Sequence, residues 1–224
     1  MDESLFYAKI LKTGPGSSIQ DLGRSTGSHW GVPASGVADA ISALWVNHIL
    51  KNDPNSAVIE ITQPGFILEF EAHTCIAWAG AKAKIIFNGL ILNTIQTLLV
   101  QPNDRLEIGS FEMGAKLYLG IQHGFFSPEV LGSRSFYPGI TSQTDLRKGD
   151  LISHRKLDGL PTPNFSLAKW STNWFESEYL DFYPGPDFGL LSEIHQERLV
   201  TEPFTISALT SRMGIILEEA LENN

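Results

Sequence analysis

Alternation of apolar and polar positions dominates the first half of the chain. From Phe66 to Glu71 every second side chain is a large apolar one, which is the period of a strand with one buried face. Residues 84–87 and 90–92 flank Asn88-Gly89, and this dipeptide predicts a tight hairpin because both residues tolerate positive φ. Further strands are predicted at residues 74–78, 98–100, 106–108 and 117–121. Short strands at this spacing are typical of a β-barrel or a β-sandwich.

One segment follows a helical period instead. Its apolar residues recur three or four positions apart: Ile41, Leu44, Trp45 and Ile49. We expect a helix with Asp39 or Ser35 as its N-cap and a stop before Pro54. A glycine-bearing turn that ends at Gly36 precedes it. The free N–H groups and positive dipole at such a helix start can hold an anion, although the same turn is also common without any ligand.

The pattern changes after residue 126. Residues 127–177 carry many prolines and glycines with only short apolar stretches, which predicts a connector and loops. Residues 178–224 are expected to start a second β domain, with a strand at 179–186 that leads into a turn and a short helix near 190–199. The predicted fold is therefore mainly β, with a first β domain over residues 1–126, one or two short helices, and an incomplete second domain.

Composition limits the classes of function. The chain has 224 residues, of which 42% are hydrophobic, and its formal net charge is −9. An acidic chain without a basic run argues against nucleic acid and anionic membranes as partners. The longest uncharged run, residues 85–103, is interrupted by Asn88-Gly89 and by Pro102, so no transmembrane segment is expected. With a single cysteine, Cys75, and no signal-peptide pattern at the start, we expect a cytoplasmic protein.

Three short stretches combine arginine with glycine and serine. They contain Arg24, Arg134 and Arg212. Each guanidinium is a planar fork suited to carboxylate or phosphate, and the glycines let backbone N–H groups approach an anion closely. We expect the three turns to converge on a pocket for a small acidic or amide metabolite. The alternative is that each arginine is buried and satisfies loop carbonyls.

Other side chains supply candidates for acid/base chemistry and for hydrogen bonding. Asp21 and Glu60 are candidate catalytic groups for acid/base chemistry such as the activation of water. Asp39 is a candidate substrate ligand, and it is also explained as a helix cap. The candidate donors to an oxyanion are Ser35, Ser133 and Ser135, and Gly36 is a further candidate substrate-binding residue. No Gly-x-Ser-x-Gly elbow surrounds these serines, and the six histidines lack metal-ligand spacing, so neither a nucleophilic serine nor a metal site is expected.

These motifs, taken in order, resemble the biotin-dependent carboxyltransferase family. The family includes the C component of 5-oxoprolinase, allophanate hydrolase subunit 2 and the antagonist of the sporulation kinase inhibitor. The resemblance covers nearly the whole chain, and the residues that carry it are 20–24, 31–39, Asn47, 59–62, 80–81, 131–135, 183–186 and 211–214. It implies tandem cyclophilin-like β-barrel domains. The family pattern continues beyond the Arg-Met-Gly motif at 212–214, so the second barrel is expected to be incomplete.

The resemblance also implies a function. It implies the ATP-dependent opening of 5-oxoproline to glutamate beside a companion subunit similar to the B component of 5-oxoprolinase or to a kinase inhibitor, with ATP bound by that partner or shared with it. A carboxyltransferase subunit acting on urea is one alternative. A non-catalytic module that binds a kinase-inhibitor-like partner is another, and the missing C-terminal pattern favours it. No biotin-acceptor Met-Lys-Met motif is present, so a self-contained carboxylase is not expected.

Overall fold

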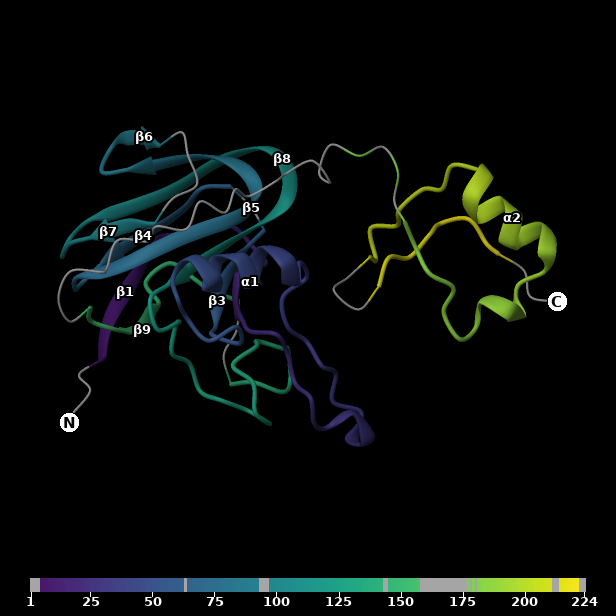
Figure 1. Ribbon diagram of the computed structural model, residues 1–224, viewed down its shortest axis with the longest axis horizontal. Helices are drawn as coiled ribbons and strands as arrows, with labels where there is room; N and C mark the ends of the chain where they lie inside the picture. The colour runs from purple at the N-terminus through teal and green to yellow at the C-terminus, as the bar shows by residue number, and fades with distance from the viewer. Residues whose placement is uncertain are drawn as a thin grey trace. The chain divides into compact units, whose positions relative to one another are not determined.

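The chain divides into two compact units, Met1–Lys169 and Trp170–Asn224. The division falls within the range that the sequence assigns to the connector. Figure 1 shows strands gathered in the first unit and a short helix with irregular chain in the second. The computed structural model describes residues 5–62, 64–92, 97–142, 145–157, 177, 179, 181–210 and 214–221.

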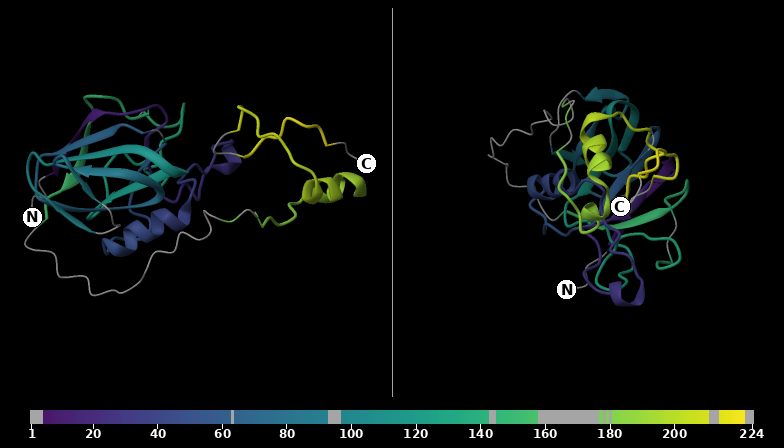
Figure 2. Two further views of the ribbon diagram at one scale, coloured as in Figure 1. Left: turned by 90° about the horizontal axis from the view of Figure 1, so that it is seen from above. Right: turned by 90° about the vertical axis from the view of Figure 1, so that its right-hand side faces the viewer.

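The described part of the first unit contains one antiparallel sheet of nine strands. The strands are β1 (Leu5–Lys12), β2 (Ser18–Gln20), β3 (Val58–Ile61), β4 (Phe66–Phe70), β5 (Thr74–Phe87), β6 (Leu90–Leu92), β7 (Leu98–Val100), β8 (Arg105–Ile121) and β9 (Leu151–Arg155). Along one path their order is β2-β3-β8-β4-β1-β9, while β5 pairs with β6, β7 and β8. The sheet curls like half a barrel (Figures 1 and 2). The predicted mainly β fold is confirmed.

The long strand β8 organises this sheet. Its first half pairs with β4, its second half pairs with β3, and β5 pairs with it from Ile76 opposite Ile121 to Phe87 opposite Leu106. The sequence predicts two separate strands at 106–108 and 117–121, and this is wrong because residues 109–116 continue the same strand. The register with β5 shifts between Gly80 and Ile85. Such bulges let two long strands bend together.

The hydrophobic core draws its side chains from most strands of the sheet. Its fully buried large side chains include Ile10, Ile59, Phe66, Leu68, Ile76, Leu106, Ile108 and Leu117. The predicted alternation in β4 is confirmed, because Phe66, Leu68 and Phe70 are buried while the residues between them are partly exposed. The predicted hairpin at Asn88-Gly89 joins β5 to β6.

Helix α1 (Ala40–Ile49) packs on β5 and β8 (Figure 2). Asp39 is its N-cap, as predicted, and accepts a hydrogen bond from the Ser42 backbone N–H at 3.0 Å. Gly120 on β8 makes the close approach possible, since a Cβ there would lie 2.2 Å from a methyl carbon of the buried Val46. Glycine at this one position therefore sets how closely the helix sits on the sheet.

Strand β9 lies inside the range predicted to be connector and loops, and that prediction missed it. It pairs antiparallel with β1, with Leu5 opposite Arg155 and Ala8 opposite Ile152. The strand is short, and its buried positions are Ile152 and a histidine, His154. A polar residue in place of an apolar one removed the alternation that would have revealed it.

His154 is fully buried, and this burial lowers the pKa of its imidazole below the usual value of 6.5. The unfolded chain therefore binds more protons than the folded one below about pH 6.5. We expect the free energy of unfolding to decrease as the pH falls through this range, by about 1.4 kcal/mol for each unit of pKa difference. Urea unfolding at pH 7.5 and 5.5 measures this loss. His154→Gln should reduce it, the exposed control His73→Gln should not, and an equal loss in all three proteins would contradict the assignment.

The second unit contains a 3₁₀ turn η3 (Phe188–Leu190), helix α2 (Glu193–Thr201), capped by Ser192, and an isolated bridge between Ile206 and Leu217. The predicted short helix is confirmed within three residues. The predicted strand at 179–186 is not formed by the described residues there, where Pro184 and Pro186 provide no backbone donors. No described residue of this unit is buried. Neither α-helix in the described residues is long and apolar enough to cross a membrane.

Candidate functional site

Asp21 lies one residue beyond β2 and joins two motifs that are more than 100 residues apart. Its Oδ1 accepts hydrogen bonds from the Gly23 N–H at 2.8 Å and from the hydroxyls of Ser133 and Ser135 at 2.6 Å each. Its Oδ2 accepts one from the Arg134 N–H at 2.6 Å. The residue is 3% exposed. Four donors on one buried carboxylate hold the loops together, and we call this set of loops the Asp21 cluster.

Two glycines allow the backbones of this cluster to touch. Gly23 and Gly36 have φ values of 97° and 94°, which side chains rarely permit. A Cβ on Gly23 would lie 2.8 Å from the Ala34 carbonyl oxygen, and one on Gly36 would lie 2.9 Å from the Leu22 carbonyl carbon. The sequence predicts that these glycines let backbone N–H groups approach an anion. In the structure they instead let two backbone segments approach each other.

The turn before α1 is the third loop of the cluster. The Val37 N–H donates to the Asp21 carbonyl at 2.9 Å, and the Arg24 N–H donates to the Ala34 carbonyl at 2.7 Å. The Ser35 hydroxyl donates to the Phe136 carbonyl at 2.8 Å. The structure thus brings together the candidate residues Asp21, Arg24, Ser35, Gly36, Ser133, Arg134 and Ser135.

Glu60 anchors the same turn from the sheet side. On β3 it lies opposite Ser18 of β2 and Tyr118 of β8, and it is fully buried. Its Oε2 accepts hydrogen bonds from the Ala38 N–H at 2.8 Å and from the Tyr118 hydroxyl at 3.0 Å, while its Oε1 accepts one from Lys116 Nζ at 3.0 Å. The Tyr118 hydroxyl in turn accepts from the Asp39 N–H at 2.8 Å.

Burial, followed by the negative charge of Glu60, raises the pKa of the Tyr118 phenol above its usual value. Tyr118 therefore stays protonated and serves as a donor to Glu60. Sequence reasoning missed Tyr118 and Lys116, because residues 117–121 are otherwise an apolar run. The available signal was the strand period, which places Lys116 and Tyr118 on the same side of β8.

Arg134 and Arg24, the two motif arginines among the described residues, have different interaction partners. Arg134 donates to the Ser127 carbonyl, pairs with Glu129 at 3.6 Å, and lies over the Phe126 ring at 5.4 Å from its centroid. Arg24 is 5% exposed and donates through Nη2 to the Ser135 carbonyl. Its Nε and Nη1 are buried without a hydrogen-bond partner. Arg212 lies outside the described residues.

The geometry favours a positioning role for both carboxylates that the sequence nominates for catalysis. Asp21 and Glu60 are buried, and their oxygen atoms already accept hydrogen bonds from several donors. Asp39 caps α1 and also accepts from the Ser42 hydroxyl. Among the described residues, no group of three or more His, Cys, Asp or Glu is placed to hold a metal ion.

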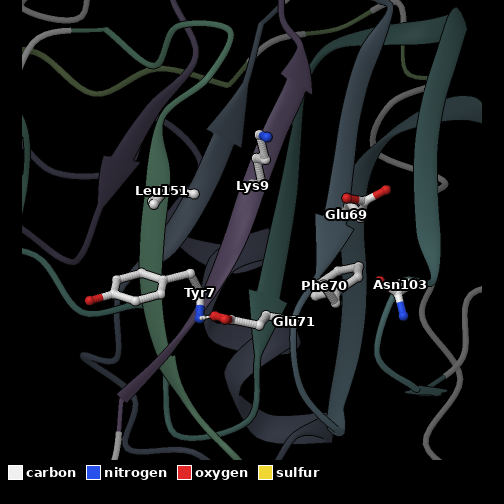
Figure 3. Close-up of a pocket in the computed structure, with 7 residues that line it drawn as sticks. All are labelled: Tyr7, Lys9, Glu69, Phe70, Glu71, Asn103 and Leu151. Atoms are coloured by element: carbon white, nitrogen blue, oxygen red, sulfur yellow. Dashed lines mark hydrogen bonds between the residues drawn. The ribbon is translucent and has the colours of Figure 1, made fainter.

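Two shallow hollows lie elsewhere on the first unit. One, of about 220 Å³, is on the outer face of the sheet, where Figure 3 shows side chains from adjacent strands and Glu71 accepts from the Tyr7 N–H at 2.9 Å. Its lining residues are Tyr7, Lys9, Glu69, Phe70, Glu71, Asn103 and Leu151. The other, of about 300 Å³, is lined by Ile19, Phe126, Ser142, Leu146, Asp150, Leu151 and Ile152. None of the candidate residues that the structure describes lines either hollow.

Comparison with known proteins places these features in a family. Residues 30–223 match the family described as a carboxyltransferase domain, subdomain A and B. The chain is 25% identical over 217 residues to the C component of the Escherichia coli 5-oxoprolinase, which covers 94% of this chain and 68% of that protein. It is 35% identical over 131 residues to the urea amidolyase of Saccharomyces cerevisiae, which covers 58% of this chain and 7% of that protein.

The fold has close counterparts among solved structures. The crystal structure of the Kluyveromyces lactis urea carboxylase matches 100% of this chain and 21% of that one, with a TM-score of 0.78 and 25% sequence identity. The chain therefore spans a small part of the large yeast proteins and about two thirds of the bacterial protein.

Proposed function

Because the chain belongs to the carboxyltransferase domain family, subdomain A and B, we propose that it is one subunit of an ATP-dependent 5-oxoprolinase. In this role it opens 5-oxoproline to glutamate together with a companion subunit that resembles the B component of 5-oxoprolinase or a kinase inhibitor. Water adds across the lactam C–N bond, and hydrolysis of ATP, bound by the companion or shared with it, drives the reaction. The likeness to a 5-oxoprolinase component over 94% of the chain supports this role.

The observation that carries the proposal is the Asp21 cluster. It gathers motif residues from both ends of the first unit around one buried carboxylate. Hydrogen-bonded loops of this kind fix the side chains they carry, and fixed positions are what a substrate site requires. We assign Asp21 and Glu60 to holding the loops. Arg24 and Arg134 are the charged side chains that the loops hold in place.

The test is ATP turnover by the chain together with its companion subunit. We expect turnover that depends on 5-oxoproline, and we expect Arg24→Ala to lower it by about 100-fold or more while the complex still assembles. Arg147→Ala, which removes an exposed arginine outside the cluster, is the matched control and should retain turnover. Full 5-oxoproline-dependent turnover in Arg24→Ala would contradict the proposal.

A second role is favoured by a different observation. The carboxylates of Asp21 and Glu60 are buried and already hydrogen-bonded, which leaves them poorly placed to exchange protons with a substrate. This favours a module that binds a kinase-inhibitor-like partner without catalysis. Binding of the companion with no effect of 5-oxoproline on ATP turnover would support the module.

The match to a urea amidolyase over 131 residues supports a third role, that of a carboxyltransferase subunit acting on urea. The same assay tests this role when urea replaces 5-oxoproline.

A further inference from the structure

The guanidinium of Arg24 is a buried charge without a counter-ion. Among the described residues no carboxylate lies within 4.0 Å of it. Arg134, in the neighbouring loop, shows the usual alternative, because it pairs with Glu129 and stacks on Phe126. A buried charge that lacks a partner is costly, so folded proteins normally provide one.

The hydrogen-bond donors of Arg24 lead to the same conclusion. A guanidinium carries five N–H hydrogens, and here only Nη2 has an acceptor, the Ser135 carbonyl. Nε and Nη1 are buried without any. Buried donors without acceptors each cost about 1–3 kcal/mol. The loops therefore hold an arginine with two nitrogen atoms that are available to an acceptor from outside the described residues.

Asp21 does not supply them. Its two oxygen atoms accept from Gly23, Arg134 and two serine hydroxyls. Ser135 stands between the two charged groups, because its hydroxyl donates to Asp21 while its carbonyl accepts from Arg24. This arrangement holds the guanidinium in place while leaving Nε and Nη1 without acceptors.

The surroundings define which anion fits. Asp21 brings a negative charge close to Arg24, and this disfavours a dianion such as hydrogen phosphate more than a monoanion. The guanidinium is a planar fork that matches the two oxygen atoms of a carboxylate, so a small planar anion suits it. We propose that Arg24 binds the carboxylate of a small organic acid through Nε or Nη1. This rests on the proposed function and names the substrate group that the Asp21 cluster recognises.

Entry of the ligand requires the loops to separate slightly, because Arg24 itself is only 5% exposed. The chain next to it is open to solvent, since Ser25 and Thr26 are both exposed. The carboxylate then replaces no protein partner of Arg24, because Nε and Nη1 have none.

Titration of the full chain with sodium 5-oxoproline, acetate and inorganic phosphate tests the site by calorimetry. We expect saturable binding of 5-oxoproline, and weaker binding of phosphate. Arg24→Met, which keeps a long side chain without the charge, should weaken 5-oxoproline binding at least about tenfold. The control Arg147→Met should stay within about twofold of the unmodified chain.

The Nε–H resonance of Arg24 in the unmodified chain gives a second readout that needs no folded variant. It should shift on addition of 5-oxoproline. No saturable binding, an unmoved resonance, or undiminished binding by a folded Arg24→Met would each overturn the proposal, and tighter binding of phosphate would overturn the carboxylate assignment. Carboxylate binding at Arg24 without 5-oxoproline-dependent ATP turnover would instead overturn the proposed enzyme role and leave the site standing.

Discussion

Replacing Asp21 with alanine is expected to lower the free energy of unfolding of the first unit by about 3–5 kcal/mol, because a buried hydrogen-bond network loses its shared acceptor. The carboxylate accepts from two backbone N–H groups and two serine hydroxyls while 3% exposed. Without it, these donors are left buried without acceptors, and the loops that carry Arg24 and Arg134 lose their common anchor. Urea unfolding followed by circular dichroism measures the change.

The isosteric Asp21→Asn separates charge from shape. An amide keeps one acceptor oxygen but places an NH₂ group against either the Arg134 N–H or the serine hydroxyls. We therefore expect a smaller decrease in the free energy of unfolding than with alanine. Asp53→Ala, at an exposed turn outside the cluster, is the control and should cost about 1 kcal/mol or less. A loss of that size for Asp21→Ala would show that the cluster does not depend on this carboxylate.

Glu60→Ala is expected to lower the free energy of unfolding by a similar amount, about 3–5 kcal/mol. The substitution removes the shared acceptor of the Ala38 N–H, the Tyr118 hydroxyl and Lys116 Nζ. The turn that leads into α1 then loses its attachment to β3 and β8. Thermal and urea unfolding report the effect, and Glu112→Ala, which breaks an exposed pair with Lys82, should cost about 0–1 kcal/mol.

A double-mutant cycle with Tyr118→Phe identifies how much of this loss belongs to the Glu60–Tyr118 contact. We expect a coupling energy within the usual range for contacting residues, about 0.5–3 kcal/mol. Additive losses in the double variant would mean that Tyr118 and Glu60 contribute independently, contrary to the 3.0 Å hydrogen bond between them.

The parts of the fold that the sequence predicts are those with a local cause. Asn88-Gly89 forces a tight turn whatever surrounds it, Asp39 caps a helix through its own neighbour Ser42, and Phe66, Leu68 and Phe70 alternate within one strand. Strand β9 was missed because His154 takes a core position, and β8 was divided because its middle is stabilised by pairing with β5 rather than by its own pattern.

The sequence predicts which residues belong to the site better than it predicts what each of them contacts. The motifs nominate Asp21, Arg24, Ser133 and Arg134, and the structure brings them together. Arg134 is the paired arginine because Glu129 and Phe126 lie beside it. The Asp21 carboxylate accepts hydrogen bonds from serines of a distant loop. Such contacts are tertiary, so residue type and spacing do not determine them.

The most direct test of this account is a structure of the chain and its companion subunit with 5-oxoproline bound. The account predicts the carboxylate of 5-oxoproline within about 3 Å of Nε or Nη1 of Arg24, with Asp21 still bonded to Ser133 and Ser135. A ligand that lies in one of the shallow hollows, or anywhere out of reach of Arg24, would contradict it.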